Sequence, residues 1–463
     1  MSIRITILLA VVFAFLAAKA AQAAERPNFI VIITDDQRFD ALGCMGHPFL
    51  KTPNIDKLRA EGALFSNAFV TTSLCAPSRA SFATGTYAHR HLVTYNERGG
   101  RDPNFNVTPN VGQVLQKAGY QTAWIGKWHQ QFNNDGPRPG FSYWLSFKGQ
   151  GVYNDPQLNE NGRSFKETGY ITEILNKHAV DFIKQNKDKP FCMFLAHKAV
   201  HDPRTVRERD RNLYPDATIP EPESWNDTLE GKPEWQKAPS RSKVQSYDPA
   251  NKNRIDYFRL LTAVDDGVGE IVQTLKDQGQ LDNTMILYTS DNGYFMGEHK
   301  RGDKRLAYEE SIRIPWVMRY TPMIKPGSTV DRMVLNIDVA PTICDLAGVK
   351  PAETMQGMSL VPLMQGKTDG WRKSFLYEYW VDFIPSIPEM IGVRTDDMIL
   401  VKYPHIHDID EMYDLKNDPK EMHNVAQDPK YAEKKKELEA ELERLKRETD
   451  WKQVASTRPT TQG

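Results

Sequence analysis

The sequence predicts an α/β protein in which buried strands alternate with amphipathic helices. Residues 28–34 form a short, continuous apolar run rich in β-branched side chains, which is typical of a strand buried on both faces, as in a parallel sheet. Residues 253–278 carry apolar side chains at helical spacing. The chain has 463 residues, which is long for one hydrophobic core. We therefore expect one large α/β domain with a smaller addition, or two lobes.

Residues 1–23 have the features of a secretory signal peptide. Arg4 precedes an apolar run from Ile5 to Ala18, and Ala21-Gln22-Ala23 has the form of a cleavage site. No other stretch approaches about 18 apolar residues, so we expect no membrane span. These features predict a periplasmic or secreted protein.

The composition is ordinary for a globular protein, with 40% hydrophobic and 26% charged residues and a formal net charge of −1. With a net charge this close to zero, the protein does not attract an anionic polymer through its overall charge, and we expect no nucleic-acid partner. The four cysteines are too sparse for a disulfide framework. Cys192 and Cys344 lie in apolar runs and are expected in the core. The sequence does not exclude a disulfide bond at Cys44. Cys75 alone has an electropositive context.

The first strand ends in two adjacent carboxylates, Asp35 and Asp36. The carboxyl ends of strands in α/β sheets are where such proteins bind ligands. An ordinary solvated loop is the alternative, because paired aspartates are common in loops. Paired carboxylates at such a position can also bind a hard cation such as Ca²⁺ or Mg²⁺.

Cys75 stands just before the predicted start of a helix. Pro77 suits the first turn, residues 78–84 can continue the helix, and Gly85 can end it. Arg79 lies one turn along on the same face as Cys75. A nucleophile beside a cation at a helix N-terminus predicts a site for sulfate or phosphate. The alternative is a buried cysteine with a structural role only.

Further buried strands are also followed by polar side chains. Residues 121–126 lead to Lys127 and His129, residues 190–195 to His197 and His201, and residues 284–289 to Asp291 and Asn292. Helices are predicted at residues 53–62, 110–119, 170–187 and 338–347. Residues 130–170 are loop-rich, and residues 204–250 are charged and rich in proline. A segment of this length with little periodicity is typically functional or mobile.

The chain changes character after about residue 370. Short strand-like runs at 375–380, 390–393 and 398–403 are joined by polar turns. A helix at 431–447 carries one narrow stripe of leucines, Leu438, Leu442 and Leu445. This stripe predicts a helix docked on the surface rather than a coiled coil.

The segment Cys75-Ala76-Pro77-Ser78-Arg79 resembles the C-x-P-S-R signature of the type I sulfatases. Two later segments resemble blocks of the same family: Lys304 with the run from Tyr308 to Pro315 that follows it, and residues 412–419. The resemblance covers about residues 26–425. It implies the fold of the alkaline phosphatase superfamily: a three-layer sandwich with a large mixed sheet, plus a small C-terminal antiparallel sheet. We expect a catalytic domain at 24–369 and a C-terminal subdomain with a terminal helix at 370–463.

The resemblance also implies the chemistry of the site. Cys75 would be oxidised to formylglycine (3-oxoalanine) by a formylglycine-generating or sulfatase-maturating enzyme. The expected ligands of one divalent cation are Asp35, Asp36, Cys75, Asp291 and Asn292. Because these donors are oxygens, Ca²⁺ or Mg²⁺ is favoured over Zn²⁺. The expected catalytic residues are Cys75, Arg79, Lys127, His129, His201 and Lys304.

The implied reaction is hydrolysis of a sulfate ester. A hydroxyl of the hydrated aldehyde attacks sulfur, and His201 or Lys304 protonates the leaving oxygen. His129 then takes a proton from the second hydroxyl so that sulfate is released. Arg79, Lys127 and Lys304 would hold the remaining negative charge.

The expected substrate is a sulfated saccharide. The segments at 140–153 and 197–201 resemble bacterial glycan sulfatases grouped with N-acetylglucosamine-6-sulfatases. His197, His299 and Arg301 are candidate substrate-binding residues. Two alternatives are a phosphodiesterase or phosphonate hydrolase of the same superfamily, and an inactive secreted glycan-binding protein. The sequence shows no second His and Asp cluster for a two-zinc site, and its Lys and His set is intact, which argues against both.

Overall fold

A ten-stranded mixed sheet runs through the centre of the protein. The structure is a computed structural model that describes residues 26–96, 108–238, 243–382 and 386–454. In sheet order the strands are β13 (Ser328–Val330), β2 (Ala63–Phe65), β12 (Trp316–Arg319), β9 (Thr284–Ser290), β1 (Asn28–Thr34), β8 (Phe191–Ala196), β4 (Gln121–Gly126), β5 (Tyr143–Ser146), β6 (Gln157–Glu160) and β7 (Arg163–Lys166).

The four central strands are parallel. β1 pairs with β8 on one side and β9 on the other, and β4 pairs with β8. Their carboxyl ends therefore meet at one edge of the sheet, where ligands of α/β proteins bind. The polar residues that follow each of these strands are brought together at this edge.

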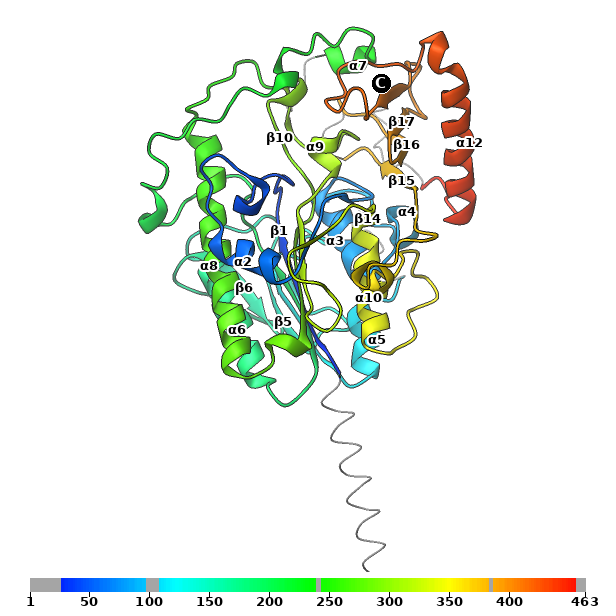
Figure 1. Ribbon diagram of the computed structural model, residues 1–463. Helices are drawn as coiled ribbons and strands as arrows, with labels where there is room; N and C mark the ends of the chain where they lie inside the picture. The colour runs from blue at the N-terminus through cyan, green and yellow to red at the C-terminus, as the bar shows by residue number, and fades with distance from the viewer. Residues whose placement is uncertain (1–25, 97–107, 239–242, 383–385, 455–463) are drawn as a thin grey trace, which may run out of the picture.

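Helices cover both faces of the sheet (Figure 1). One face packs against α2 (Pro53–Glu61), α6 (Ile171–Gln185) and α8 (Lys252–Asp277), and the other against α3 (Cys75–Thr84), α5 (Val111–Lys117) and α10 (Val339–Leu346). Alternate residues of β1 serve the two cores: Ile30 and Ile32 lie in the first, Phe29 and Val31 in the second. The predicted three-layer arrangement is confirmed.

A second sheet lies beside the C-terminal helix (Figure 1). It is antiparallel throughout and contains β15 (Ser374–Tyr379), β16 (Met390–Thr395), β17 (Met398–Lys402) and β18 (Glu411–Asp414). The helix α12 (Ala432–Glu448) buries Leu438, Leu442 and Leu445 in the core of this sheet, so the predicted docked helix is confirmed. Phe69 and Leu74 belong to the same core. The division of the chain near residue 370 stays a prediction.

The remaining strands and α-helices are short. They are the parallel pair β3 (Ala68–Phe69) and β14 (Val334–Leu335), the antiparallel pair β10 (Phe295–Met296) and β11 (Gly302–Asp303), and the helices α4 (Ala88–His91), α7 (Glu234–Lys237), α9 (Glu309–Ile312) and α11 (Val361–Met364).

The stretch 130–170 differs from its prediction, because it contains the strands β5, β6 and β7 rather than loop alone. These strands have four residues each, and β7 is largely exposed, so they lack the continuous apolar pattern of a buried strand. A smaller difference is that Cys75 is the first residue of α3 rather than the residue before it. Gly85 ends this helix with φ of 67°, as its sequence position predicts.

The predicted signal peptide at 1–23 lies outside the described residues. Within the described ranges, no helix is long and apolar enough to cross a membrane. The four cysteines all lie in those ranges, and each is a free thiol there, Cys44 included.

Candidate active site

The carboxyl ends of the four central strands bring the predicted site residues together. β1 leads directly into Asp35 and Asp36, and β9 into Asp291 and Asn292. The other residues at this edge are Lys127 and His129 after β4, His197 and His201 after β8, Cys75 and Arg79 from α3, and Lys304 after β11. All of them except His201 are at most 3% exposed. Residues spread over 270 positions of the chain thus form one buried cluster.

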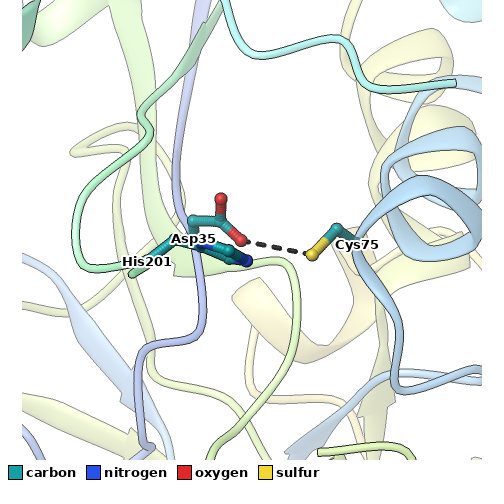
Figure 2. A group of neighbouring side chains, drawn as sticks. All are labelled: Asp35, Cys75 and His201. Atoms are coloured by element: carbon teal, nitrogen blue, oxygen red, sulfur yellow. Dashed lines mark hydrogen bonds between the residues drawn. The ribbon is translucent and has the colours of Figure 1, made fainter. Parts of the chain in front are cut away.

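An acidic group surrounds Cys75. The carboxylates of Asp35, Asp36 and Asp291 and the Sγ atom of Cys75 offer ligand atoms that all lie within 4.8 Å of one another. Figure 2 shows Asp35, Cys75 and His201 converging, with the Cys75 thiol donating to Asp35 Oδ1 at 3.3 Å. The backbone N–H of Asp36 donates to Asp291 Oδ1 at 3.1 Å, which ties the ends of β1 and β9 together.

Arg79 and Lys127 neutralise part of this acidic group. Arg79 is fully buried, and its Nε donates to Asp291 Oδ2 at 2.8 Å while one terminal nitrogen donates to the backbone carbonyl of Lys127 at 2.9 Å. Lys127 Nζ forms an ion pair with Asp35 and donates to Gln150 Oε1 at 2.6 Å. Gln150 is a site residue that the sequence does not predict, because an amide in a loop-rich stretch carries no distinguishing pattern.

Lys304 and His201 lie on the Asp36 side. Lys304 Nζ forms an ion pair with Asp36 and lies 3.3 Å from Cys75 Sγ. His201 Nδ1 lies 2.6 Å from the carbonyl of Asp202, which can only accept, so we assign a proton to Nδ1. His201 Nε2 then faces the site, 3.8 Å from Asp36 Oδ2.

His129 and His197 are buried imidazoles whose ring nitrogens have no hydrogen-bond partner among the described residues. Burial, reinforced by the positive charge of Lys127, holds the pKa of His129 well below its ordinary value. Burial and Arg79 lower the pKa of His197 to about 3. Both rings are therefore neutral near pH 7, and each has a nitrogen able to accept a proton.

The acidic group does not ionise uniformly. Burial opposes charge on Asp35, but the cations around it, Lys127 first, hold its pKa well below the usual range. Burial and the charge of Asp35 raise the pKa of Asp291 to about 7 despite Arg79. Burial and Asp35 also raise the pKa of the Cys75 thiol to about 12. The expected electropositive context of Cys75 is therefore outweighed, and an unmodified Cys75 is a neutral thiol.

The donor set fits a hard divalent cation. Besides the three carboxylates, Asn292 Oδ1 is a buried oxygen without a hydrogen-bond partner in the described part of the chain. Its Nδ2 donates to Asp36 Oδ1 at 2.7 Å, so the amide is anchored at the acidic group. A buried polar atom left unpaired is costly, and a cation bound by oxygens removes that cost.

His299 and Arg301 are not brought into this cluster. Both are 1% exposed. His299 Nδ1 lies 2.6 Å from Asp227 Oδ2, and Arg301 donates to the backbone carbonyl of Gln236 at 2.9 Å. The structure thus places these two candidate substrate-binding residues in a separate buried cluster, among side chains of the 204–250 stretch.

The large mixed sheet and the charged cluster at its edge define an enzyme with an alkaline-phosphatase-like fold. Residues 27–349 match the family described as Sulfatase, and residues 297–448 match the family described as N-sulphoglucosamine sulphohydrolase, C-terminal. The chain belongs to the sulfatase family. The predicted fold, family and enzyme class are therefore confirmed.

Relatives with known names agree with this family. N-acetylglucosamine-6-O-sulfatase of Bacteroides thetaiotaomicron is 34% identical, over 92% of this chain and 87% of the relative. Human N-acetylglucosamine-6-sulfatase is also 34% identical, over 78% of this chain and 68% of the relative. A solved structure of a protein with its substrate, D-glucosamine-2-N,6-O-disulfate, has a TM-score of 0.83 and 32% identity, covering 92% of this chain and 98% of that one.

Proposed function

We propose that this sulfatase removes an O-sulfate group from a hexosamine or related sugar at the end of a sulfated glycan, with the 6-O position favoured. The observation that carries the reaction type is the packing of Cys75 among three carboxylates and three buried cations. The names of the relatives support the sugar and the position. The signal-peptide pattern of residues 1–23 supports action in the periplasm or outside the cell.

We propose that Cys75 acts as formylglycine, whose hydrated aldehyde supplies an oxygen nucleophile and a second hydroxyl for sulfate release. The unmodified thiol, with its pKa raised to about 12, is a poor nucleophile at neutral pH. Because Cys75, Pro77 and Arg79 are completely buried in α3, the modifying enzyme must reach this segment before the chain folds.

The proposed cation is Ca²⁺ or Mg²⁺, held by Asp35, Asp36, Asp291, Asn292 and the modified residue 75. When bound, it offsets the negative charge of the sulfate ester and polarises its S–O bonds. When all three carboxylates are ionised, as binding of a cation favours, their charges and those of Arg79, Lys127 and Lys304 cancel formally. A divalent cation therefore makes the site net positive, which suits an anionic ester.

The remaining residues bind the charged sulfate group or transfer protons. Arg79 and Lys127 are buried donors directed at the acidic group and can hold the sulfate oxygens as charge develops. Lys304 Nζ and His201 Nε2 flank the Asp36 side, so we assign them to the leaving oxygen of the sugar. His129 has unpartnered ring nitrogens and is the proton acceptor for the hydroxyl that remains on residue 75.

Removal of the cation is expected to lower sulfate release about a hundredfold or more, because the ester then loses the ion that offsets its negative charge and polarises its S–O bonds. It is also expected to lower the melting temperature, since the bound ion stabilises the folded state. Both are measured on protein dialysed against a strong chelator. Protein treated with chelator plus excess Ca²⁺ is the control. Full activity in a sample shown by elemental analysis to be metal-free would refute the cation.

A panel of defined sulfated saccharides tests the substrate. We expect kcat/KM for a terminal 6-O-sulfated N-acetylglucosamine to exceed that for its 3-O-sulfated and N-sulfated analogues by about tenfold or more. Sulfate release is measured for each sugar, with 4-nitrophenyl sulfate as an activity control. Hydrolysis of 4-nitrophenyl sulfate but of no sulfated sugar would contradict the proposed substrate class, and preference for a phosphonate or phosphodiester would contradict the proposed reaction.

A further inference from the structure

Asp227, Lys232 and His299 form a closed cluster apart from the catalytic residues. They are 2%, 1% and 1% exposed. Lys232 Nζ donates to Asp227 Oδ2 at 2.6 Å and to the backbone carbonyl of Glu421 at 2.8 Å. His299 Nδ1 lies 2.6 Å from the same oxygen of Asp227, which can only accept, so this nitrogen carries a proton. Each charged group in the cluster is therefore paired.

The cluster joins three parts of the chain. Lys232 comes from the 204–250 stretch, and its ammonium lies 4.9 Å from the ring centre of Tyr308 and 5.1 Å from that of Tyr413. Tyr413 belongs to β18 of the small sheet, and Glu421 follows that strand. A buried ammonium is strongly destabilising unless it is paired, so these contacts fix the relative positions of the three parts.

His299 lies at the tip of a hairpin whose two ends reach the active site. The hairpin consists of β10, a 3₁₀ turn at Glu298–Lys300, and β11, with Phe295 opposite Asp303. It begins shortly after Asn292 and ends immediately before Lys304. The position of the tip therefore affects the position of Lys304.

The turn at the tip has an unusual backbone conformation. His299 and Lys300 have φ of 51° and 55°, a left-handed backbone that residues other than glycine rarely adopt. Such a conformation persists where surrounding contacts fix it. Here the N–H of Val244 donates to the carbonyl of Lys300 at 2.8 Å, in addition to the cluster at His299.

We propose that Asp227, Lys232 and His299 are positioning residues for Lys304. They fix the hairpin tip, and through β11 they place Lys304 Nζ beside Asp36 and 3.3 Å from residue 75. This role replaces the substrate contact expected for His299 and gives the 204–250 stretch a function. The inference rests on the proposed function, in which Lys304 acts on the leaving oxygen.

The test is Lys232→Met, which removes the ammonium and keeps an unbranched stem between the tyrosine rings. Lys237→Met, on the exposed part of the same segment, is the matched control. We expect kcat on the sulfated sugar to fall about tenfold to a hundredfold in Lys232→Met, with a smaller fall on 4-nitrophenyl sulfate. The 4-nitrophenyl group leaves as a stable anion, whereas the sugar oxygen must be protonated in order to leave. A lower fraction of folded enzyme would reduce both rates equally, so the ratio of the two rates reports positioning.

Hydrogen exchange of peptides covering 293–305 provides a readout that does not depend on activity. We expect faster exchange in Lys232→Met and unchanged exchange in Lys237→Met. If Lys232→Met does not fold, Asp227→Asn removes the charge at constant shape and is expected to change both readouts in the same direction. Equal losses on the two substrates together with unchanged exchange would overturn the positioning role. Faster exchange in a protein whose wild type hydrolyses no sulfate ester would leave the hairpin contact supported and refute the proposed function.

Discussion

Cys75→Ala is expected to abolish sulfate release, by a factor of about 10⁴ or more, because it removes the nucleophile itself. Alanine has no group that a maturating enzyme can convert to an aldehyde. The fold should survive, since the substitution removes one buried sulfur atom at a cost of about 1 kcal/mol. The measurements are sulfate release, melting temperature and the mass of the peptide containing residue 75.

Cys44→Ser is the matched control for this variant. Cys44 is half-buried, and its thiol belongs to no part of the site. We expect the control to keep its activity and both proteins to melt within a few degrees of the wild type. In the active wild type, the peptide with residue 75 should have the mass of the aldehyde form. Retained activity in Cys75→Ala would rule out this residue as the nucleophile, and an active enzyme with an unmodified Cys75 would rule out formylglycine.

Much of this site can be predicted from the sequence because parallel strands all end at the same edge. The apolar runs before Asp35, Lys127, His197 and Asp291 are long enough to be recognised as buried strands. Once these runs are taken as neighbouring parallel strands, the residues after them must meet. The order of the strands is not encoded in any local pattern, and it follows from the packing of the whole chain.

Contacts made by loops could not be predicted in the same way. Gln150 touches Lys127 only because β4 and β5 are neighbours and the loop after β5 returns to the site. His299 stands close in sequence to Lys304, which suggests a substrate contact. Its actual partner Asp227 is 72 positions away in a segment without periodicity.

The chemical state of Cys75 is also set by the fold rather than by its neighbours in sequence. Arg79 and the start of α3 favour a thiolate, and Lys304 lies 3.3 Å from the sulfur. Complete burial and the carboxylate of Asp35 outweigh them and raise the thiol pKa to about 12. The extent of burial and the distance to Asp35 depend on tertiary structure. The sequence therefore indicates which residue is unusual but not its protonation state.

Lys304→Met is expected to lower kcat on a sulfated sugar about a thousandfold, because it removes a proton donor and a charge from the leaving-group side. The loss on 4-nitrophenyl sulfate should be smaller, since that leaving group is stable as an anion. Steady-state kinetics on both substrates measure the difference. Lys300→Met, an exposed lysine on the same hairpin, is the control and should behave like the wild type. Equal losses on both substrates would assign Lys304 to sulfate binding and rule it out as the proton donor.

The double variant Lys232→Met/Lys304→Met connects the catalytic lysine with its proposed support. Residues that act through separate contacts usually have additive effects on the activation free energy, whereas a residue that acts through another has no effect once that other is gone. We therefore expect the double variant to have the same kcat on the sulfated sugar as Lys304→Met, within about twofold. The three variants are compared with the wild type at one pH and with the same fraction of modified residue 75. Losses that multiply would mean that the Lys232 cluster supports some other part of the site, because the path through β11 to Lys304 would then already be absent.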